Sequence, residues 1–207
     1  MCIRDRFLID KKFLDRYFSL IPRVCPHFHI PLQSGSDEVL LKMGRGYTTQ
    51  FYRELVELIR SYDRNIAIST DIIVGFPGES EKLFTETIEF CQEIGFSRAH
   101  VFVYSPRPFT PASQWDKIEG VPFQAKKDRE AQLLKIIYNS QIKYYRSFIG
   151  KTLSVLVEAT TENHEVTGYS DNYIPVRGEG IFASAYGKIL PVCIHGEKNR
   201  ILLGEAI

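Results

Sequence analysis

The order of apolar patterns changes once along the chain, and this change constrains the fold more than any other feature. Up to about residue 148, short β-branched runs alternate with stretches whose apolar residues recur at helical spacing. The runs that predict strands cover residues 27–32, 66–74 and 99–104. Such alternation predicts βαβ units with right-handed crossovers, and therefore an α/β fold built on a parallel sheet or partial parallel barrel.

Capping residues define the helices between these strands. Thr48 or Thr49 is expected to cap one helix, while Ser80 begins another that ends at Gly95. A Pro-rich loop is expected from Pro106 to Pro122, before a long amphipathic helix over 124–148.

Beyond the long helix, the pattern predicts strands only. Short β-branched runs are separated by Gly, Asn and Asp, which is typical of a small antiparallel β-barrel. These runs cover residues 152–160, 166–169, 173–177, 188–195 and 200–205. We therefore expect two domains, residues 1–148 and 149–207.

Composition limits the possible functions. With 44% hydrophobic and 25% charged residues, the chain is typical of a globular protein, and no apolar run approaches the roughly 20 residues that cross a membrane. A cytoplasmic protein without a membrane partner is expected. The cysteines are too far apart for a C-x-x-C pair or a disulfide framework: Cys2, Cys25, Cys91 and Cys193. The net charge of +1 does not indicate nucleic-acid binding, but the basic stretch 126–151 is either an RNA contact or a solvated helix face.

Polar and glycine-rich segments follow all three predicted parallel strands. They are Gln33 to Ser36, Gly75 to Glu79 and Tyr104 to Pro108. Ligands collect at the carboxyl ends of parallel strands, where glycine allows close backbone approach and Gln, Ser and Arg supply hydrogen bonds. Each segment alone could be a simple turn, but together they predict a ligand site.

Several motifs resemble one family. HIPLQSGSDEVLLKMGRGYT, STDIIVGFPGES and HVFVYSPRPFTPA resemble the second half of the partial barrel in radical-SAM methylthiotransferases. FIGKTLSVLVE, GYSDNYIPVR and GKILPVCI resemble the TRAM domain, the small barrel with which these enzymes bind tRNA. The resemblance covers residues 7–205. HVFVYS and GYSDNYIPVR are most similar to the branch that modifies N6-threonylcarbamoyladenosine beside the anticodon.

The resemblance implies cofactors that this chain alone does not bind. Members of the family hold one 4Fe-4S cluster through C-x-x-x-C-x-x-C and a second through three further cysteines, all in the N-terminal half. The first cluster cleaves S-adenosylmethionine to a 5′-deoxyadenosyl radical, and the second carries the sulfur and methyl that reach carbon 2 of the adenine. None of these cysteines is in this sequence. The chain is therefore expected to be a fragment that lacks the N-terminal half and is inactive alone.

Matching positions imply the site residues. Those expected to face S-adenosylmethionine or substrate are Gln33, Ser34 and Ser36. Those expected to line its nucleoside are Asp71, Ile73, Val74 and Gly75. Those expected to close the adenine side are Tyr104, Ser105 and Arg107. Arg45 and Tyr47 are expected near the incoming base or its phosphates. In the tail, candidates for stacking on or binding RNA are Tyr169, Tyr173, Arg177 and Lys188, with core or rim positions as the alternative.

Two departures from the family pattern stand out. Phe109 occupies the position of the glycine in the usual P-R-P-G-T, which puts the local turn and the role of Thr110 in question. The opening MCIRDR resembles translated sequencing adapter, so no function is expected for Cys2.

Other hypotheses use the same residues differently. His27 and His29 share one strand face and could form half of a metal site, although polar packing inside the barrel is the alternative. Asp71 and Glu79 could act as an acid/base pair in an iron-free enzyme, although helix capping also explains Glu79. A tRNA-binding module without catalysis is the other alternative. A truncated barrel would leave strand 27–32 at an edge beside an apolar opening, which predicts poor solubility.

Overall fold

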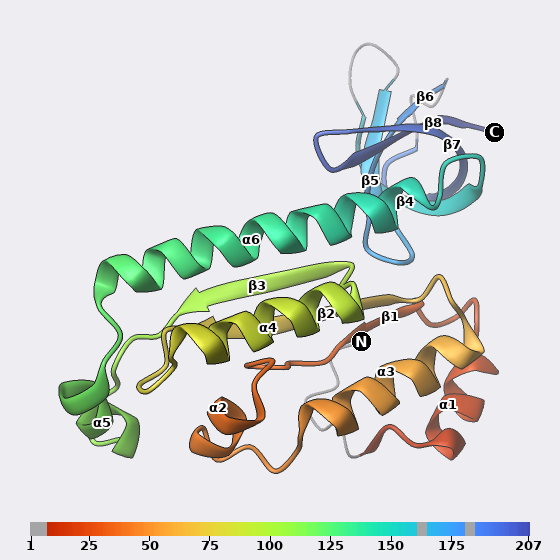
Figure 1. Cartoon of the computed structure of the whole chain (residues 1–207). Coiled ribbons are helices and arrows are strands. Elements are labelled where there is room, and N and C mark those ends of the chain that lie inside the picture. The colour runs from red at the N-terminus through yellow and green to blue at the C-terminus, as the bar shows by residue number, and fades with distance from the viewer. Residues whose placement is uncertain (1–7, 161–164, 181–184) are drawn as a thin grey trace.

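The protein consists of a parallel sheet with helices and a small closed barrel, joined by one long helix (Figure 1). The computed structural model describes residues 8–160, 165–180 and 185–207, so Cys2 and the other adapter-like residues lie outside the described part. Among the described helices, none combines the length and apolar character required of a membrane span.

The parallel sheet has the order β1-β2-β3. Its strands are β1 (His27–His29), β2 (Ala67–Val74) and β3 (Arg98–Val103), which confirms the three expected strands. β1 is shorter than expected because the Leu32 amide donates to the Thr70 side chain at 2.8 Å rather than to a backbone carbonyl of β2. The chain rejoins β2 through one bridge between Gln33 and Ile72.

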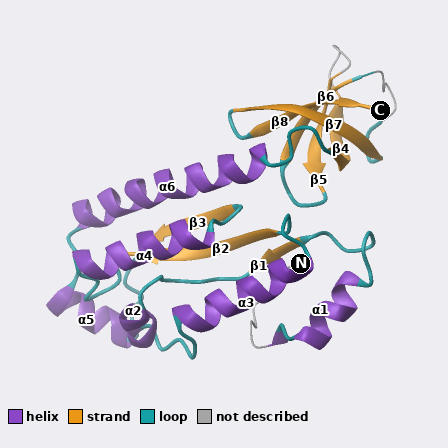
Figure 2. Cartoon of the chain, turned by 45° about the vertical axis from the view of Figure 1, so that its right-hand side comes forward, coloured by secondary structure: helices purple, strands orange, loops and turns teal. Residues whose placement is uncertain are grey.

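Helices cover one face of this sheet. They are α1 (Lys11–Phe18), α2 (Asp37–Lys42), α3 (Thr49–Tyr62), α4 (Glu81–Ile94) and α6 (Phe123–Arg146) (Figure 2). The Thr48 and Ser80 side chains accept hydrogen bonds from the amides of Phe51 and Leu83. Gly95 ends α4 with a φ of 62°. The capping residues inferred from sequence are therefore confirmed, with Thr48 rather than Thr49 at the start of α3.

The opposite face of the sheet is mainly polar. Because the strands are in parallel register, side chains of alternate residues share this face. They are His27 and His29 of β1, Ser69, Asp71 and Ile73 of β2, and Arg98, His100 and Phe102 of β3. The expected apolar opening is therefore wrong, although Phe102 is 51% exposed. In the described residues β1 pairs only with β2, so it is an edge strand as expected.

The segment expected to be a Pro-rich loop contains a helix, α5 (Pro111–Glu119). The Thr110 hydroxyl caps it by accepting a hydrogen bond from the Ser113 amide at 3.3 Å, and Pro111 begins its first turn. Phe109 lies just before this cap, fully exposed, with a φ of 65°. Glycine adopts this left-handed conformation without strain, which explains the family pattern, yet the turn and the Thr110 cap form with phenylalanine.

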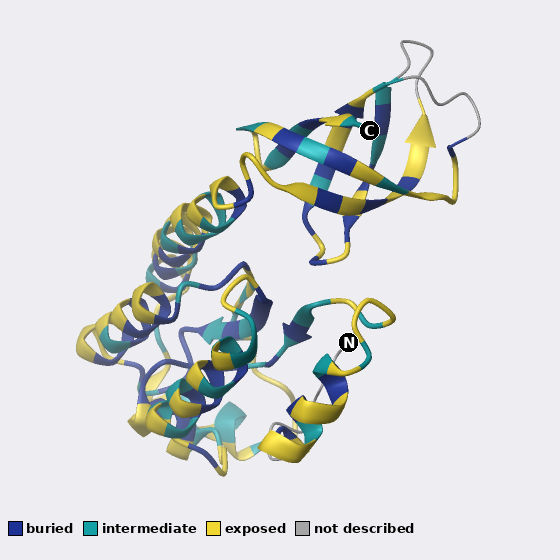
Figure 3. Cartoon of the chain, turned by 90° about the vertical axis from the view of Figure 1, so that its right-hand side faces the viewer, coloured by how far each residue is buried: buried dark blue, intermediate teal, exposed yellow. Residues whose placement is uncertain are grey.

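The tail forms a closed five-stranded barrel of order β4-β5-β6-β8-β7, in which buried and exposed residues alternate (Figure 3). Its strands are β4 (Thr152–Thr160), β5 (Glu165–Ser170), β6 (Pro175–Glu179), β7 (Ile189–Lys198) and β8 (Ile201–Ala206). β6 and β8 are parallel, so the barrel is not wholly antiparallel as expected. A closed ring with an odd number of strands cannot alternate direction throughout.

The barrel rests on the C-terminal end of α6. Tyr145 and Phe148 lie in the barrel's apolar cluster. The Tyr144 hydroxyl donates to the Asn65 carbonyl at 2.6 Å and accepts from the Asn172 amide at 3.2 Å, which joins the barrel to the sheet domain. The division into residues 1–148 and 149–207 remains a prediction. Tyr145 and Phe148 precede that boundary, yet both pack in the apolar cluster of the barrel.

A small polar cavity of about 140 Å³ separates the barrel from the N-terminal ends of the strands. The Ser69 hydroxyl lies 2.8 Å from His27 Nε2 and 3.0 Å from His29 Nδ1. Burial lowers the pKa of His27 to about 4, so this imidazole is neutral at neutral pH, and the Tyr173 ring packs against it. The two hydrogen bonds to Ser69 fit the polar-packing interpretation of this histidine pair, and in the described residues no group of three His, Cys, Asp or Glu side chains could hold a metal.

Candidate functional site

The carboxyl ends of β2 and β3 border a cavity of about 350 Å³. Such a volume falls in the range of small-molecule sites. It is lined by Lys42, Met43, Gly44, Arg45, Ile73, Phe76, Tyr104, Thr110, Pro111, Ala112 and Trp115. Three of these residues, Arg45, Ile73 and Tyr104, were predicted as site residues from separate segments. The structure brings them together.

Gln33 joins this group through Arg45. Gln33 has a φ of 72°, and its side-chain oxygen accepts a hydrogen bond from Arg45 Nη2 at 2.9 Å. Arg45 follows α2 and is exposed, so its remaining donors are open to a ligand. An arginine held in place by an amide oxygen is suited to bind a carboxylate or phosphate.

Tyr104 lies at the end of β3, with its ring edge-to-face against Phe76 at 5.2 Å between centroids. Burial raises the pKa of its hydroxyl. The hydroxyl oxygen is buried, and it has no hydrogen-bond partner among the described residues. Because buried polar groups are nearly always hydrogen-bonded, this atom indicates a ligand or water partner at the site.

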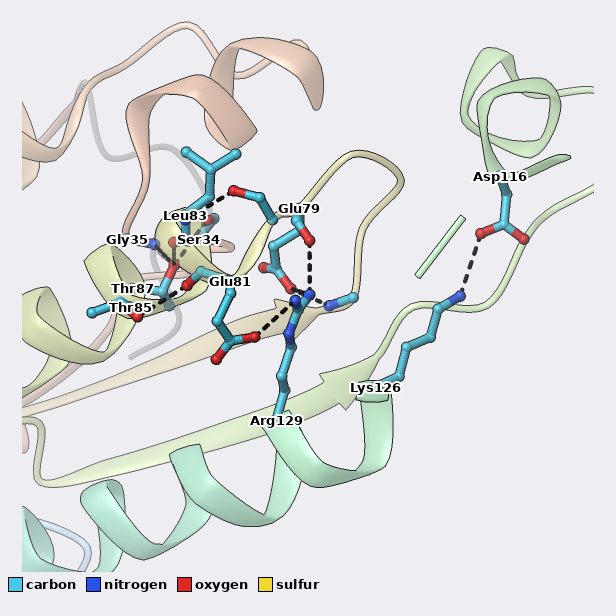
Figure 4. Close-up of polar contacts among 12 residues, drawn as sticks. Ser34, Gly35, Glu79, Glu81, Leu83, Thr85, Thr87, Asp116, Lys126 and Arg129 are labelled. Carbon is cyan, nitrogen blue, oxygen red and sulfur yellow. Dashed lines mark hydrogen bonds and ion pairs between the residues drawn. The ribbon is translucent and has the colours of Figure 1, made fainter. Parts of the chain in front are cut away.

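A buried ion pair fixes the loop that follows β2 (Figure 4). The Glu79 carboxylate accepts hydrogen bonds from the Gly75 amide at 2.6 Å and from Arg129 of α6 at 3.0 Å. Arg129 also donates to the Glu79 carbonyl at 2.8 Å and to Glu81 at 3.2 Å. Burial raises the pKa of Glu79, and the Gly75 amide and Arg129 oppose this rise. The Glu79–Arg129 ion pair therefore holds the loop after β2 against α6.

These contacts do not fit an acid/base pair. Glu79 is buried, with its Oε2 held by the Gly75 amide and Arg129, and Asp71 accepts a hydrogen bond from His29 Nε2 at 3.2 Å on the open face of the sheet. Glu79 does not cap α4 either, because Ser80 is the capping residue. Both earlier interpretations of Glu79 are therefore wrong.

Lys126 is a second buried cation near the site. Its ammonium lies 3.3 Å from Asp116 of α5 and 5.1 Å from the Tyr104 ring centroid. A side chain at Gly75 would collide with the Lys126 stem, so glycine is required where the loop passes beneath this lysine. Sequence reasoning missed Lys126 and Arg129 as site residues because both fall in the basic stretch that suggested a solvated helix face.

Other predicted cofactor residues lie elsewhere. The Ser34 and Ser36 hydroxyls are buried against α4, where they contact Thr87 at 3.3 Å and Glu86 at 2.6 Å. Val74 is fully buried in the core beneath the helices. Ser105 and Arg107 are exposed in the segment after β3.

The predicted RNA-binding residues do not form one patch. Tyr47 is 8% exposed and donates to the Leu32 carbonyl, which indicates a structural role. Tyr169 lies in an exposed row across the barrel with Leu156 and Ile189. Arg177 and Lys188 are also exposed on the barrel. Tyr173 instead packs against His27.

The described cysteines lie in three different places. Cys25 is exposed before β1, and Cys193 is half-buried on β7. Cys91 is buried in the core of the sheet domain, and burial strongly raises its pKa. They do not form a shared metal site.

Comparisons with known proteins agree with this arrangement. The Radical SAM superfamily model matches residues 3–91. The solved structure of coproporphyrinogen III oxidase from Escherichia coli, described as a radical SAM enzyme, superposes with a TM-score of 0.55 at 16% identity. The superposition covers 95% of this chain and 46% of the oxidase chain. At this level of identity it supports a similar fold and no shared function.

Curated relatives are more similar in sequence. Threonylcarbamoyladenosine tRNA methylthiotransferase MtaB of Thermotoga maritima is 43% identical over 76% of this chain and 36% of its own length. The tRNA-2-methylthio-N(6)-dimethylallyladenosine synthase of Dictyoglomus thermophilum is 40% identical over 94% of this chain and 44% of its own length. The synthase of the same name from Bacillus subtilis is 36% identical over 95% of this chain and 39% of its own length. The chain thus spans less than half the length of these relatives, and it belongs to the tRNA methylthiotransferase family of the radical SAM superfamily.

Proposed function

We propose that this chain forms the S-adenosylmethionine-facing wall and the RNA-contacting part of an enzyme that methylthiolates carbon 2 of an N6-modified adenosine beside the anticodon of tRNA. The observation that carries the proposal is the cavity at the carboxyl ends of β2 and β3, where Gln33, Arg45, Ile73 and Tyr104 meet. Ligand sites of parallel α/β folds lie at this edge of the sheet.

The cavity suits part of S-adenosylmethionine. Ile73 and the Tyr104 ring offer apolar and aromatic surface to a nucleoside, while Arg45, oriented by Gln33, offers donors to a carboxylate. The Tyr104 hydroxyl can donate to an acceptor on the ligand. When bound, S-adenosylmethionine supplies the methyl group and the radical chemistry, and these side chains hold and orient it.

The described cysteines do not fit an iron-sulfur cluster. Cys91 lies in an apolar core, and Cys25 and Cys193 belong to different domains. A cluster needs several thiolates converging on one point. We therefore propose that any cluster is bound outside the described residues, and we assign no step of the reaction to these cysteines.

The charge at the cavity favours one substrate branch. Threonylcarbamoyladenosine carries a carboxylate, whereas the dimethylallyl group is apolar. With Arg45 assigned to S-adenosylmethionine, Arg107 after β3 is a further exposed cation suited to bind that carboxylate. Methylthiolation of N6-threonylcarbamoyladenosine is the branch we propose.

A chimera tests this function. The 157 matching residues of Thermotoga maritima MtaB would be replaced with those of this chain, and tRNA nucleosides would be analysed by mass spectrometry in a host lacking the endogenous activity. We expect methylthio-threonylcarbamoyladenosine. Modification of dimethylallyladenosine instead would overturn the substrate branch. RNA binding without methylthiolation by a folded chimera would favour the alternative, a tRNA-binding module without catalysis.

Tyr104 provides a sharper prediction within this chimera. Replacing Tyr104 with phenylalanine removes only a hydroxyl that has no partner among the described residues, so stability should change by less than about 1 kcal/mol. Methylthiolation should fall about tenfold, because the ligand loses a hydrogen bond. Tyr47→Phe is the matched control, since it removes a hydroxyl that donates to the Leu32 carbonyl. It should lower the melting temperature more than Tyr104→Phe does, and activity that follows the melting temperature in both variants would argue against the assignment.

A further inference from the structure

A groove lies between the C-terminal half of α6 and the β7–β8 hairpin, away from the strand-end cavity. The hairpin reaches toward this part of α6 (Figures 1 and 2). The groove encloses about 610 Å³. It is lined by Tyr138, Asn139, Ile142, Lys143, Arg146, Glu197, Lys198 and Asn199.

The groove is strongly basic. Lys143, Arg146 and Lys198 line it, and Arg200 lies at its rim beside Tyr138. Among the described residues that line it, Glu197 is the only acid; its side chain is 4% exposed and accepts a hydrogen bond from Arg146 Nε at 3.2 Å. Neither lysine forms an ion pair with an acid of the described residues, and both lysines are exposed.

The hairpin turn holds an arginine in a strained conformation. Asn199 and Arg200 have φ values of 53° and 62°, which makes this a two-residue turn with both central residues left-handed. Glycine is preferred at the second of these positions, because a side chain there is strained. The Arg200 guanidinium lies 5.7 Å from the Tyr138 ring centroid. Strain retained at an exposed residue is often associated with function.

We propose that this groove binds the sugar-phosphate backbone of RNA. The proposal rests on the proposed function and locates an RNA contact in a groove that Tyr169 and Lys188 do not line. Cations provide affinity for phosphates, the exposed Tyr138 can stack against a base or sugar, and the amides of Asn139 and Asn199 can donate to phosphate oxygens.

The test is fluorescence anisotropy of the full chain with a labelled tRNA anticodon stem-loop. Lys143→Glu and Lys198→Glu should each weaken binding about tenfold and lower the slope of log K against log salt by about one. Glu197→Gln should strengthen binding about threefold, because it removes the lone carboxylate and keeps an acceptor for the Arg200 amide at 3.0 Å. General loss of structure would weaken RNA binding in every variant. It would not produce weaker binding in Lys198→Glu and stronger binding in the neighbouring Glu197→Gln.

Two controls complete the design. Lys82→Glu makes the same charge change at an exposed site on α4 and should stay within about twofold of the parent, allowing only for net charge. Arg200→Gly should weaken binding without lowering the melting temperature, because it relieves the left-handed strain.

Three outcomes would overturn the proposal that this groove binds RNA. They are no binding by the parent chain, lysine variants that bind like Lys82→Glu, and competition by polyglutamate equal to that by RNA, which would indicate an acidic protein partner. The chimera measures methylthiolation independently of these binding experiments. A result against RNA binding in the groove is therefore distinguishable from a result against the proposed function.

Discussion

Replacing Arg129 with methionine should destabilise the sheet domain by about 3–5 kcal/mol, because the Glu79 carboxylate would remain buried without its countercharge. The loop from Gly75 would also lose its link to α6, since Arg129 donates to both the carboxylate and the carbonyl of Glu79. Urea unfolding followed by the fluorescence of Trp115 measures this effect. Trp115 is the only tryptophan, and its ring centroid on α5 lies 6.5 Å from that of Phe76, which belongs to the loop after β2.

Two variants separate the buried charge from other causes. Arg53→Met removes an arginine whose partner Glu93 is 48% exposed, so it should lower the free energy of unfolding by less than about 1 kcal/mol. Adding Glu79→Gln to Arg129→Met should restore part of the stability, since no charge is then left buried. Equal losses of unfolding free energy in Arg129→Met and Arg53→Met, or no recovery of stability in the double variant, would contradict this role of the Glu79–Arg129 ion pair.

Local signals account for the parts of the fold that the sequence predicted well. Thr48, Ser80 and Gly95 determine helix ends through hydrogen bonds within a few residues, so their roles are visible in short windows of sequence. The alternation of apolar residues in β4 is equally local. The helix α5 was missed because its flanking prolines suggested a loop, although Thr110 followed by Pro111 is a helix-start signal.

Long-range contacts account for the parts that the sequence did not predict. Arg129 and Lys126 are buried because Glu79 and Asp116 lie opposite them, and a helical pattern cannot distinguish a paired buried cation from a solvated one. The Ser34 hydroxyl was assigned to the cofactor because its position matches the family motif after a strand end. It turns toward Thr87 instead, a contact that depends on how α4 packs.

The same packing positions the cofactor-facing segment, and Gly35 is its most constrained residue. A methyl group there would lie 2.7 Å from the Cα of Thr87 and 2.9 Å from the Cβ of Phe90. Neither atom is the end of a flexible side chain, so α4 or the segment must shift. The Gly35 amide also donates to the Thr87 hydroxyl at 3.1 Å. Gly35→Ala should therefore lower the free energy of unfolding by about 3 kcal/mol, measured by urea unfolding.

The shift should also move Gln33, because only Ser34 separates it from Gly35. Arg45 would then lose the side-chain oxygen that holds it in place. Methylthiolation by the chimera should fall more than its folded fraction does. Gly46→Ala is the matched control, since nothing lies within 4 Å of the added methyl and alanine restricts the unfolded chain. It should be neutral or slightly stabilising, with activity unchanged. If Gly35→Ala behaved in the same way, α4 would not be what positions this wall of the cavity.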